Sequence, residues 1–260
     1  MVNLKIATIS YLNSIPFVYG LESSEIKNDL ILDNPSACAQ MLLNDEVDIA
    51  LVPVDILPLL KNYHIVGNSC IGSNGKVETV CLFSDVPLNQ IDTILLDYQS
   101  RTSVALVKVL CYQFWNIKPK FIDAKPNYES KIKSNIAGLI IGDRAYDYTK
   151  KYRYVYDLSE QWQLYTKLPF VFACWVSTKK LESKLEKEFN QAISFGISNL
   201  NKALAQSQDN FETSIDKKQY LTEIISYKFD NDKQQALKLF LSYVNLFSIC
   251  FFFLFSSHFL

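Results

Sequence analysis

The sequence predicts an α/β protein built as two lobes with a ligand cleft between them. Short apolar runs of strand length alternate with helical patterns, which is typical of a mainly parallel sheet covered by helices. A late apolar run, 168–176, is expected to carry the chain back to the first lobe. Hydroxyl residues and an arginine stand where a strand gives way to a helix, at 100–103. Ligand pockets favour interfaces between domains, so we expect the binding site there.

Composition narrows the function classes. The chain has 260 residues, 49% of them hydrophobic and 20% charged, and a formal net charge of −1. Because it lacks a basic stripe, nucleic acid is not an expected partner. The six cysteines form no Cys-x-x-Cys pair and no cluster with histidine, which argues against a metal site and a disulfide framework and fits a reducing cytosol. The N-terminus lacks the features of a signal peptide, so we expect a cytoplasmic location, and we expect no cofactor.

The chain opens with a strand, 4–9, that ends in a turn or a helix start. Ser10, Asn13 and Ser14, followed by Pro16, provide the turn chemistry. Ligands bind at strand ends in open α/β sheets, which makes the two serines and the asparagine candidate contacts. Turn formation alone is the alternative interpretation of these residues.

Alternating elements fill the first lobe, which we place at 1–84 and 176–240. They are expected in this order: strand 30–32, helix 37–43, strand 47–53, short helix 54–60, strand 63–71, loop 72–75 and strand 77–83. The segment from Ser84 to Pro87 interrupts the pattern, and we expect the chain to cross into the second lobe there.

The second lobe is organised around a strand, 93–97, that leads into a helix. Ser100, Arg101, Thr102 and Ser103 stand at the helix start, where a hydroxyl oxygen caps the unpaired N–H groups of the first turn. These N–H groups and the positive end of the helix dipole favour an anion. The arginine adds a planar fork that pairs with a carboxylate. A well-capped helix with a solvated arginine is the alternative interpretation.

Further alternating elements complete the second lobe, 88–172: strand 120–123, helix 128–133, strand 137–143 and strand 154–158. Asp143 closes an apolar strand, where its carboxylate is placed to cap the next helix or to face a ligand. After a return crossing near 172–175, helices are expected at 181–205 and 220–226. One α/β lobe inserted into another is the layout of the two-lobed, type II periplasmic-binding-protein-like fold.

Five short motifs carry a resemblance to a known family. The sequence reads Ser-Tyr-Leu-Asn-Ser-Ile-Pro at 10–16, and four motifs follow in the family's order at similar spacing: 47–53, 100–103, 140–143 and 168–175. Over roughly residues 4 to 240, the chain resembles the MqnA family, the chorismate dehydratases of the futalosine route to menaquinone. The 1,4-dihydroxy-6-naphthoate synthase of a later step shares the fold but lacks the Ser-Tyr-Leu-Asn opening.

The resemblance implies a lyase that removes water from chorismate to give 3-[(1-carboxyvinyl)oxy]benzoate. Chorismate would be its small-molecule partner. Arg101 and the hydroxyl groups beside it would hold one of the two carboxylates. Ser10 and Asn13 resemble the family's ligand contacts in the first lobe, and Ser73 and Thr79 lie where its second loop contributes hydroxyl groups.

The sequence leaves the general base open. His64 and His258 lie in no matched motif. An amide does not act as a base near neutral pH, so Asn13 is expected to polarise the departing hydroxyl group. One hypothesis is that the enolpyruvyl carboxylate of the substrate takes the proton, and Asp143 is the alternative base.

Two other function classes fit the same fold. A non-catalytic small-anion solute-binding protein would have the cleft without the chemistry, although the sequence contains neither a signal peptide nor a lipobox cysteine. A regulatory effector-binding domain would be expected beside a DNA-binding helix-turn-helix segment, and none is apparent. An assay of chorismate consumption separates the enzyme from both.

The last residues, 244–260, form an atypical apolar tail. From Leu239 to Leu260 the sequence carries no formal charge, and by length and apolarity it passes for a membrane span. The family instead ends in an amphipathic helix, a pattern kept here only from Lys233 to Tyr243. Three interpretations stay open: a tail anchor in contact with a membrane, a helix buried in the first lobe, and an aberrant end such as a shifted reading frame.

Overall fold

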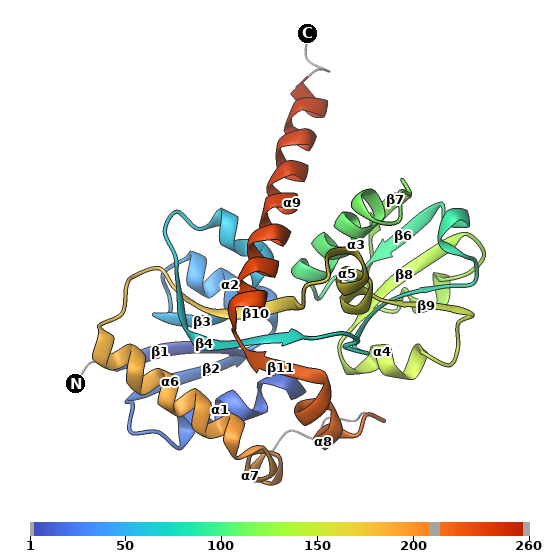
Figure 1. The fold of residues 1–260 in the computed structure, drawn as a ribbon. Helices are drawn as coiled ribbons and strands as arrows, with labels where there is room; N and C mark the ends of the chain where they lie inside the picture. Colours follow the sequence, from blue (N-terminus) through green and yellow to red (C-terminus); the bar gives the residue numbers. More distant parts are fainter. Residues whose placement is uncertain (1–2, 208–213, 257–260) are drawn as a thin grey trace.

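The computed structural model describes residues 3–207 and 214–256, with side chains as far as residue 247. In this part of the chain, the fold is a mixed α/β arrangement with two β-sheets, one of six strands and one of five (Figure 1). Helices cover both sheets. The long helix α9 (Asn231–Ser256) starts against the first sheet and projects away from the body of the molecule. The fold class is the one that the sequence predicts.

The six-stranded sheet is mixed rather than mainly parallel. Its strands lie in the order β11 (Ile225–Lys228), β4 (His64–Ser73), β10 (Phe170–Ser177), β3 (Ile49–Pro53), β1 (Leu4–Ile9) and β2 (Asn28–Asp33). β1 runs parallel to β2 and β3, whereas β10 is antiparallel to β3 and β4, and β11 is antiparallel to β4. The returning strand β10 therefore occupies the middle of the sheet.

The five-stranded sheet is built entirely from the segment between β4 and β10. Its strands lie in the order β7 (Lys120–Asp123), β6 (Thr93–Leu96), β8 (Ile136–Ile141), β5 (Val80–Ser84) and β9 (Tyr154–Asp157). β6 is parallel to β7 and β8, while β5 is antiparallel to β8 and β9. The ends of β6 and β8 consequently lie at the same edge of this sheet.

Both crossings between the sheets lie earlier than the sequence indicates. The sequence pattern puts β5 in the first lobe, but β5 pairs with β8 and β9 and so belongs to the second sheet. The chain crosses between Ser73 and Val80 rather than at 84–87, and it returns before Phe170 rather than at 172–175. A buried apolar run predicts a strand, but it does not say which sheet the strand joins.

Local capping sets the start of several helices. Asn34, Ser100 and Asp157 each accept a backbone N–H of the first turn, at the starts of α2, α3 and α5 respectively. The helices are α1 (Ile15–Glu22), α2 (Pro35–Leu43), α3 (Arg101–Gln113), α4 (Asp143–Tyr148), α5 (Leu158–Thr166), α6 (Ser183–Ser198), α7 (Leu200–Gln206), α8 (Lys217–Gln219) and α9, with short helical turns at η1 (Leu12–Ser14), η2 (Val54–Leu59), η3 (Leu88–Gln90), η4 (Glu129–Lys131) and η5 (Tyr220–Ile224).

The expected helix at 220–226 is wrong in its last part. The π-helical turn η5 fills the first part, but Ile225 begins β11, which pairs with β4. Ile225 and Tyr227 are buried and alternate with less buried neighbours, which is the periodicity of a strand. The expected loop at 72–75 likewise begins too early, because β4 continues to Ser73.

Aromatic side chains fix the base of α9 against β10 and α5. Phe240 packs edge-on against Phe170 with ring centroids 5.1 Å apart, and against Trp162 at 6.0 Å. All three side chains are buried. Fully burying such a side chain contributes about 1.5–3 kcal/mol. The first turns of α9 therefore belong to the core.

The predicted tail, 244–260, is described only in part. α9 continues as a helix to Ser256, and Phe247 packs on Tyr112 of α3 with ring centroids 5.3 Å apart. Within the described residues, no helix combines the length and the apolarity needed to cross a membrane. The side chains of residues 248–260 lie outside the described residues, so the three interpretations of the tail stay predictions.

Candidate functional site

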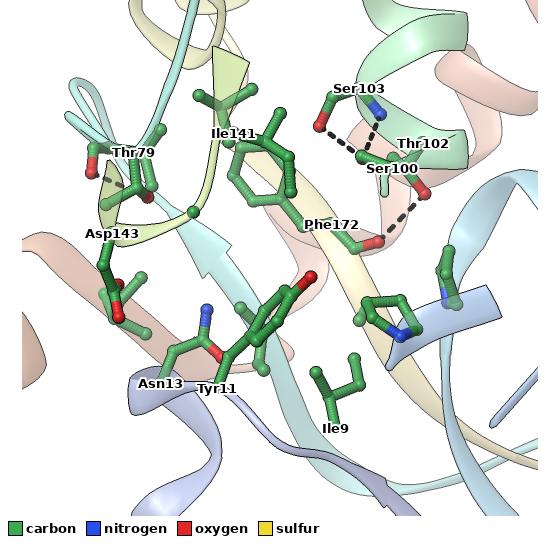
Figure 2. Close-up of a pocket in the computed structure, with 18 of the residues that line it drawn as sticks. Ile9, Tyr11, Asn13, Thr79, Ser100, Thr102, Ser103, Ile141, Asp143 and Phe172 are labelled. Carbon is green, nitrogen blue, oxygen red and sulfur yellow. Dashed lines mark hydrogen bonds between the residues drawn. The ribbon is translucent and has the colours of Figure 1, made fainter. Parts of the chain in front are cut away.

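A cavity of about 80 Å³ lies where the two sheets meet (Figure 2). Ile9 at the end of β1, Pro53 at the end of β3 and Phe172 in β10 line it from the first sheet. Ile141 and Gly142, at the end of β8, line it from the second. One water molecule needs roughly 10–15 Å³ measured in this way, so the cavity has room for several waters or a small ligand.

The cavity brings together six of the site residues that the sequence proposes. They come from η1, the crossing between β4 and β5, the start of α3 and the start of α4. The six are Asn13, Thr79, Ser100, Thr102, Ser103 and Asp143. Segments far apart in the sequence therefore present polar groups to one largely apolar space.

Ser100 fixes the shape of the start of α3. Its Oγ accepts the backbone N–H of Ser103 at 3.1 Å, and its hydroxyl group donates to Ser103 Oγ at 2.8 Å. Thr102 Oγ1 lies 3.2 Å from the carbonyl oxygen of Phe172 and also 3.2 Å from Oδ1 of Asp55. The predicted cap is confirmed, and Thr102 joins α3 to a strand of the other sheet.

Arg101 does not line the cavity, contrary to the sequence-based expectation. Its Nε donates to Oδ2 of Asp55 at 3.1 Å, and 48% of its side chain is exposed. Burial raises the pKa of Asp55, and the charge of Arg101 opposes that shift. The guanidinium lines a separate hollow with Lys108 and Phe247. Asp55 thus pairs with the Nε of the arginine that the sequence assigns to a substrate carboxylate.

Ser10 and Ser73 also lie outside the cavity lining. Ser73, at the buried end of β4, shares a hydrogen bond of 2.5 Å with Ser159 at the start of α5. Ser10 lines a neighbouring hollow with Tyr19 and Glu22. Ser10 stands between Ile9 and Tyr11, which both line the cavity, and successive side chains along extended backbone point to opposite sides. The position of Ser73 instead follows from its hydrogen bond to Ser159.

Asn13 is held by hydrogen bonds to both its backbone and its side chain. Its carbonyl oxygen accepts from Tyr227 Oη at 3.1 Å, and its Oδ1 accepts from Ser14 Oγ at 3.4 Å. The Tyr220 hydroxyl group lies 3.1 Å from Thr79 Oγ1, and the side chain of Asn13 opposes the rise in the pKa of Tyr220. Asn13 is therefore held at its backbone carbonyl oxygen and at its side-chain Oδ1.

Two tyrosines of the cavity are missing from the sequence-based site. Burial raises the pKa of Tyr11 to about 12, with a further contribution from Asp97, and burial also raises the pKa of Tyr220. Both therefore keep their protons at neutral pH and present neutral O–H groups. Tyr11 stands inside the opening motif, where it was available as a candidate. Tyr220 falls in a segment expected to be an ordinary helix, so no signal marked it.

Asp143 is the one carboxylate among the described residues that line the cavity. It is the first residue of α4, and Gly142 occupies the N-cap position, so the capping interpretation does not hold. Burial raises the pKa of the Asp143 carboxyl, and Lys217 opposes that shift. No lysine, arginine or histidine belongs to the described lining. An anionic ligand would therefore meet hydroxyl, amide and backbone N–H donors.

A comparison with protein-family models covers almost the whole molecule. The model described as menaquinone biosynthesis matches residues 4–245, from β1 into α9. The chain belongs to this menaquinone biosynthesis family. Both sheets and the cavity fall inside the match, and the resemblance drawn from the five motifs agrees with it.

Several solved structures of other proteins have a fold similar to that of this menaquinone biosynthesis protein. A protein from Archaeoglobus fulgidus superposes with a TM-score of 0.75 at 14% identity, covering 95% of this chain and 98% of that one. A Candida albicans gene product, described as exhibiting the generic periplasmic binding protein fold, has a TM-score of 0.67 at 14% identity, with coverages of 95% and 91%. An ABC transporter from Parabacteroides distasonis gives 0.67 at 14%, with coverages of 95% and 93%. At such identities the likeness shows the fold alone, which is periplasmic-binding-protein-like.

Proposed function

We propose that this member of the menaquinone biosynthesis family is a chorismate dehydratase. It would remove water from chorismate to give 3-[(1-carboxyvinyl)oxy]benzoate. The observation that carries the proposal is a single cavity that joins the Asn13 amide, the Asp143 carboxylate and the hydroxyl-rich start of α3. Family membership supports the pathway, and the motif resemblance supports the choice of reaction.

The donors in the cavity suit a substrate with two carboxylates. Ser103 offers a hydroxyl proton, because its oxygen accepts from Ser100, whereas Thr102 donates within the protein. The first turn of α3 adds N–H groups at the positive end of the helix dipole. Tyr11 and Tyr220 add neutral O–H donors. A hydrogen bond to a charged group typically contributes about 1.5–3 kcal/mol, so several such donors can replace a cation.

The elimination needs an acceptor for one proton and a donor to one oxygen. A C–H bond and a C–O bond break at neighbouring ring carbons, and the ring becomes aromatic. Asp143 is one acceptor for the ring proton, because burial raises its pKa toward the range where a general base works best. The enolpyruvyl carboxylate of the substrate is the other. The carboxyl group that receives the proton passes it to the departing hydroxide, which leaves as water.

Asn13 would stabilise the departing oxygen. Its amide lines the cavity, as does Asp143, and Figure 2 shows the two on the same side of the cavity. An N–H donor aimed at the oxygen favours the transition state, where negative charge develops on that oxygen. Ser14 and Tyr227 hold Asn13 at its Oδ1 and its backbone carbonyl oxygen before the substrate arrives, so little reorganisation is needed during the reaction.

A binding protein without chemistry is the second candidate. It is supported by the fold, which this chain shares with a protein described as exhibiting the generic periplasmic binding protein fold and with an ABC transporter. Such a protein would bind chorismate or another small anion in the same cavity and release it unchanged.

The test is incubation of the purified protein with chorismate. We expect the ultraviolet absorbance of chorismate to decline, with a product lighter by one water that is identified by mass spectrometry as 3-[(1-carboxyvinyl)oxy]benzoate. Saturable binding of intact chorismate without a product would favour the binding protein. Absence of both binding and turnover would rule out chorismate as the ligand, and 1,4-dihydroxy-6-naphthoate synthase activity would be assayed next.

A further inference from the structure

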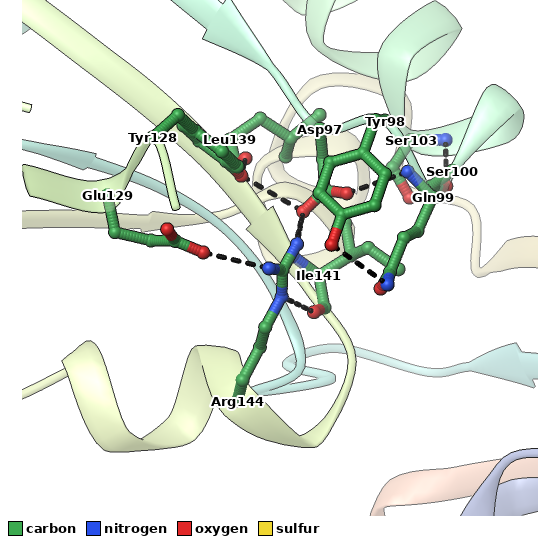
Figure 3. Close-up of polar contacts among 10 residues, drawn as sticks. All are labelled: Asp97, Tyr98, Gln99, Ser100, Ser103, Tyr128, Glu129, Leu139, Ile141 and Arg144. Atoms are coloured by element: carbon green, nitrogen blue, oxygen red, sulfur yellow. Dashed lines mark hydrogen bonds and ion pairs between the residues drawn. The ribbon is translucent and has the colours of Figure 1, made fainter. Parts of the chain in front are cut away.

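An ion pair between a buried carboxylate and a partly exposed arginine lies behind two walls of the cavity (Figure 3). Asp97 directly follows β6, and none of its side chain is exposed. Arg144 is the neighbour of Asp143 in α4, and its Nη2 donates to Oδ2 of Asp97. Neither residue belongs to the cavity lining, and neither is used in the proposed reaction.

The Asp97 carboxylate holds two backbone segments that lead into the cavity. Its Oδ1 accepts the N–H of Gln99 at 2.8 Å, directly before the hydroxyl groups at the start of α3. Its Oδ2 accepts the N–H of Ile141 at 3.1 Å, two residues before Asp143. Oδ2 also accepts the hydroxyl proton of Tyr128 at 3.0 Å. One carboxylate therefore links the end of β6 to the end of β8.

Arg144 secures the second of these segments from the other side. Its Nε donates to the carbonyl oxygen of Ile141 at 3.3 Å, and its Nη1 donates to Glu129 at 2.8 Å. Figure 3 shows the guanidinium surrounded by these partners, and it also lies over the ring of Tyr98 at 5.4 Å. All three nitrogens of the guanidinium are thus engaged. The N–H and C=O groups of Ile141 are both held by the ion pair.

Gly142 separates this fixed point from Asp143. Its φ of 75° lies in the left-handed region, where glycine moves freely and other residues are strained. A glycine alone would allow the turn several conformations. Holding Ile141 on one side and Arg144 on the other restricts that freedom, and the restriction sets the direction of Asp143.

We propose that Asp97 and Arg144 are positioning residues, which together hold Asp143 and the α3 hydroxyl groups in one geometry for the ligand. The ion pair is the physical connection between these two walls of the cavity. The catalytic part of this inference rests on the proposed function. The structural part, that one carboxylate couples the two walls, does not.

Simple stabilisation of the fold is the competing explanation, and a double-mutant cycle separates the two. Asn fits the space of Asp97, but it loses the charge and turns an N–H₂ group toward one of the present donors. If Asp97 acts through the walls, its effect on turnover depends on the groups that the walls carry. If Asp97 only stabilises the fold, the effect of Asp97→Asn on turnover and the effect of the second substitution are additive in free energy.

The kinetic test measures kcat and KM for chorismate in cycles of Asp97→Asn with Asp143→Asn and with Ser103→Ala. We expect Asp97→Asn to lower kcat/KM by about 100-fold in the wild type. In a protein that already carries Asp143→Asn or Ser103→Ala, the same substitution should lower kcat/KM by less than about tenfold. Arg144→Lys should lie between the wild type and Arg144→Ala, because Lys replaces one of the three donors. Additive effects in both cycles would overturn the proposal.

Asp230→Asn is the matched control. Asp230 forms an ion pair with the buried Lys233 at 3.8 Å, and neither residue lines the cavity. This variant should lose thermal stability without any coupling to Asp143→Asn. Equal coupling in the control would mean that destabilisation alone explains the result.

Hydrogen exchange tests the coupling without any turnover. In Asp97→Asn we expect the amides of Gln99, Ser103, Ile141 and Gly142 to exchange at least about tenfold faster as one group. Glu129→Gln removes only the outer partner of Arg144 and should leave these rates unchanged. Wild-type rates in Asp97→Asn would refute the coupling even if chorismate is the substrate. Faster exchange with an inactive wild type would refute the proposed function and keep the coupling.

Discussion

Single residues of the cavity combine one carboxylate with groups that stay neutral at physiological pH. Asp143 faces this space without a cation among the described lining residues, and burial disfavours its charged form. Tyr11, Tyr220 and Asn13 supply donors that carry no charge. A buried carboxylate of this kind lowers the stability of the fold and is useful for proton transfer. A substitution that removes its charge should therefore raise the stability of the protein and lower its activity.

Replacing Asp143 with Asn should separate these two responses. Because burial places the folded-state pKa above the unfolded value of 3.8, the folded protein binds this proton first as the pH falls. Between the unfolded and the folded pKa of Asp143, the free energy of unfolding falls as the pH rises. The buried, charged carboxylate therefore still destabilises the folded protein at neutral pH. We expect Asp143→Asn to melt at or above the temperature of the wild type at neutral pH, with an advantage that shrinks toward about pH 4. A wild type that is more stable than the variant at neutral pH would contradict this.

Replacing Asn13 with Ala tests the donor to the departing oxygen. The amide is needed mainly in the transition state, so we expect kcat to fall by about 10²–10³-fold while KM changes little. Steady-state kinetics on chorismate provide the measurement. Asn201→Ala, at an exposed position in α7, is the control and should behave as the wild type. An unchanged kcat would remove Asn13 from the mechanism.

Replacing Arg101 with Lys should have only a minor effect on catalysis. The guanidinium is half-exposed and paired with Asp55 outside the cavity, so a lysine ammonium can keep part of that ion pair. We expect kcat/KM to change by less than about tenfold, which corresponds to about 1.4 kcal/mol. A larger loss of kcat/KM without a change in melting temperature would show that Arg101 contributes to substrate binding.

Individual elements show which features a sequence reveals. Ser100 is found as a cap because capping depends on a few neighbouring residues, and the strand at β1 follows from its own sequence. The sheet that β5 joins depends on β8 and β9, which lie far along the chain. Arg101 is misplaced for the same reason: its partner Asp55 comes from η2 of the other lobe. Local chemistry is predictable here, and pairing between distant segments is not.

Removing the cap of α3 should affect both the helix and the cavity. Ser100→Ala loses the acceptor for the N–H of Ser103, and the loss of an N-cap typically costs about 0.5–2 kcal/mol of stability. Ser103 also loses a hydrogen-bond donor at its own hydroxyl group. We therefore expect KM for chorismate to rise along with the loss of stability, measured by denaturant unfolding and kinetics. Ser100→Thr, which keeps a capping hydroxyl group, should recover most of the stability.

The whole molecule places its cavity between two sheets that are joined by two chain crossings. The crossings leave from β4 and return into β10, which are neighbours in the first sheet. Asp157 accepts the N–H groups of Val77 and Glu78 in the first crossing, at 2.9 and 2.7 Å, and so ties that crossing to the start of α5. Motion of one sheet against the other would therefore turn about a short region beside the cavity.

Ligand binding should bring the two sheets closer together. Contacts made by one ligand to residues of both sheets favour a closed arrangement, as in other hinged two-lobed folds. We expect a smaller radius of gyration in solution X-ray scattering when chorismate or a slowly reacting analogue is present at saturating concentration. A profile that stays the same under saturation would mean that the cavity accepts its ligand without closing.

The central position of β10 has a consequence for synthesis of the protein on the ribosome. β4 pairs only with β10 and β11 among the described strands, and β3 receives its second neighbour only from β10. At roughly 5–20 residues per second, on the order of 5–20 seconds separate the emergence of β4 from that of β10. During that interval the strands of the second sheet, β5 to β9, are all made, while the fully buried strand β3 has an unpaired edge. Such edges pair readily with other chains, so a nascent chain paused before Phe170 would be prone to aggregate through β3 and through β4, which then has no partner on either side.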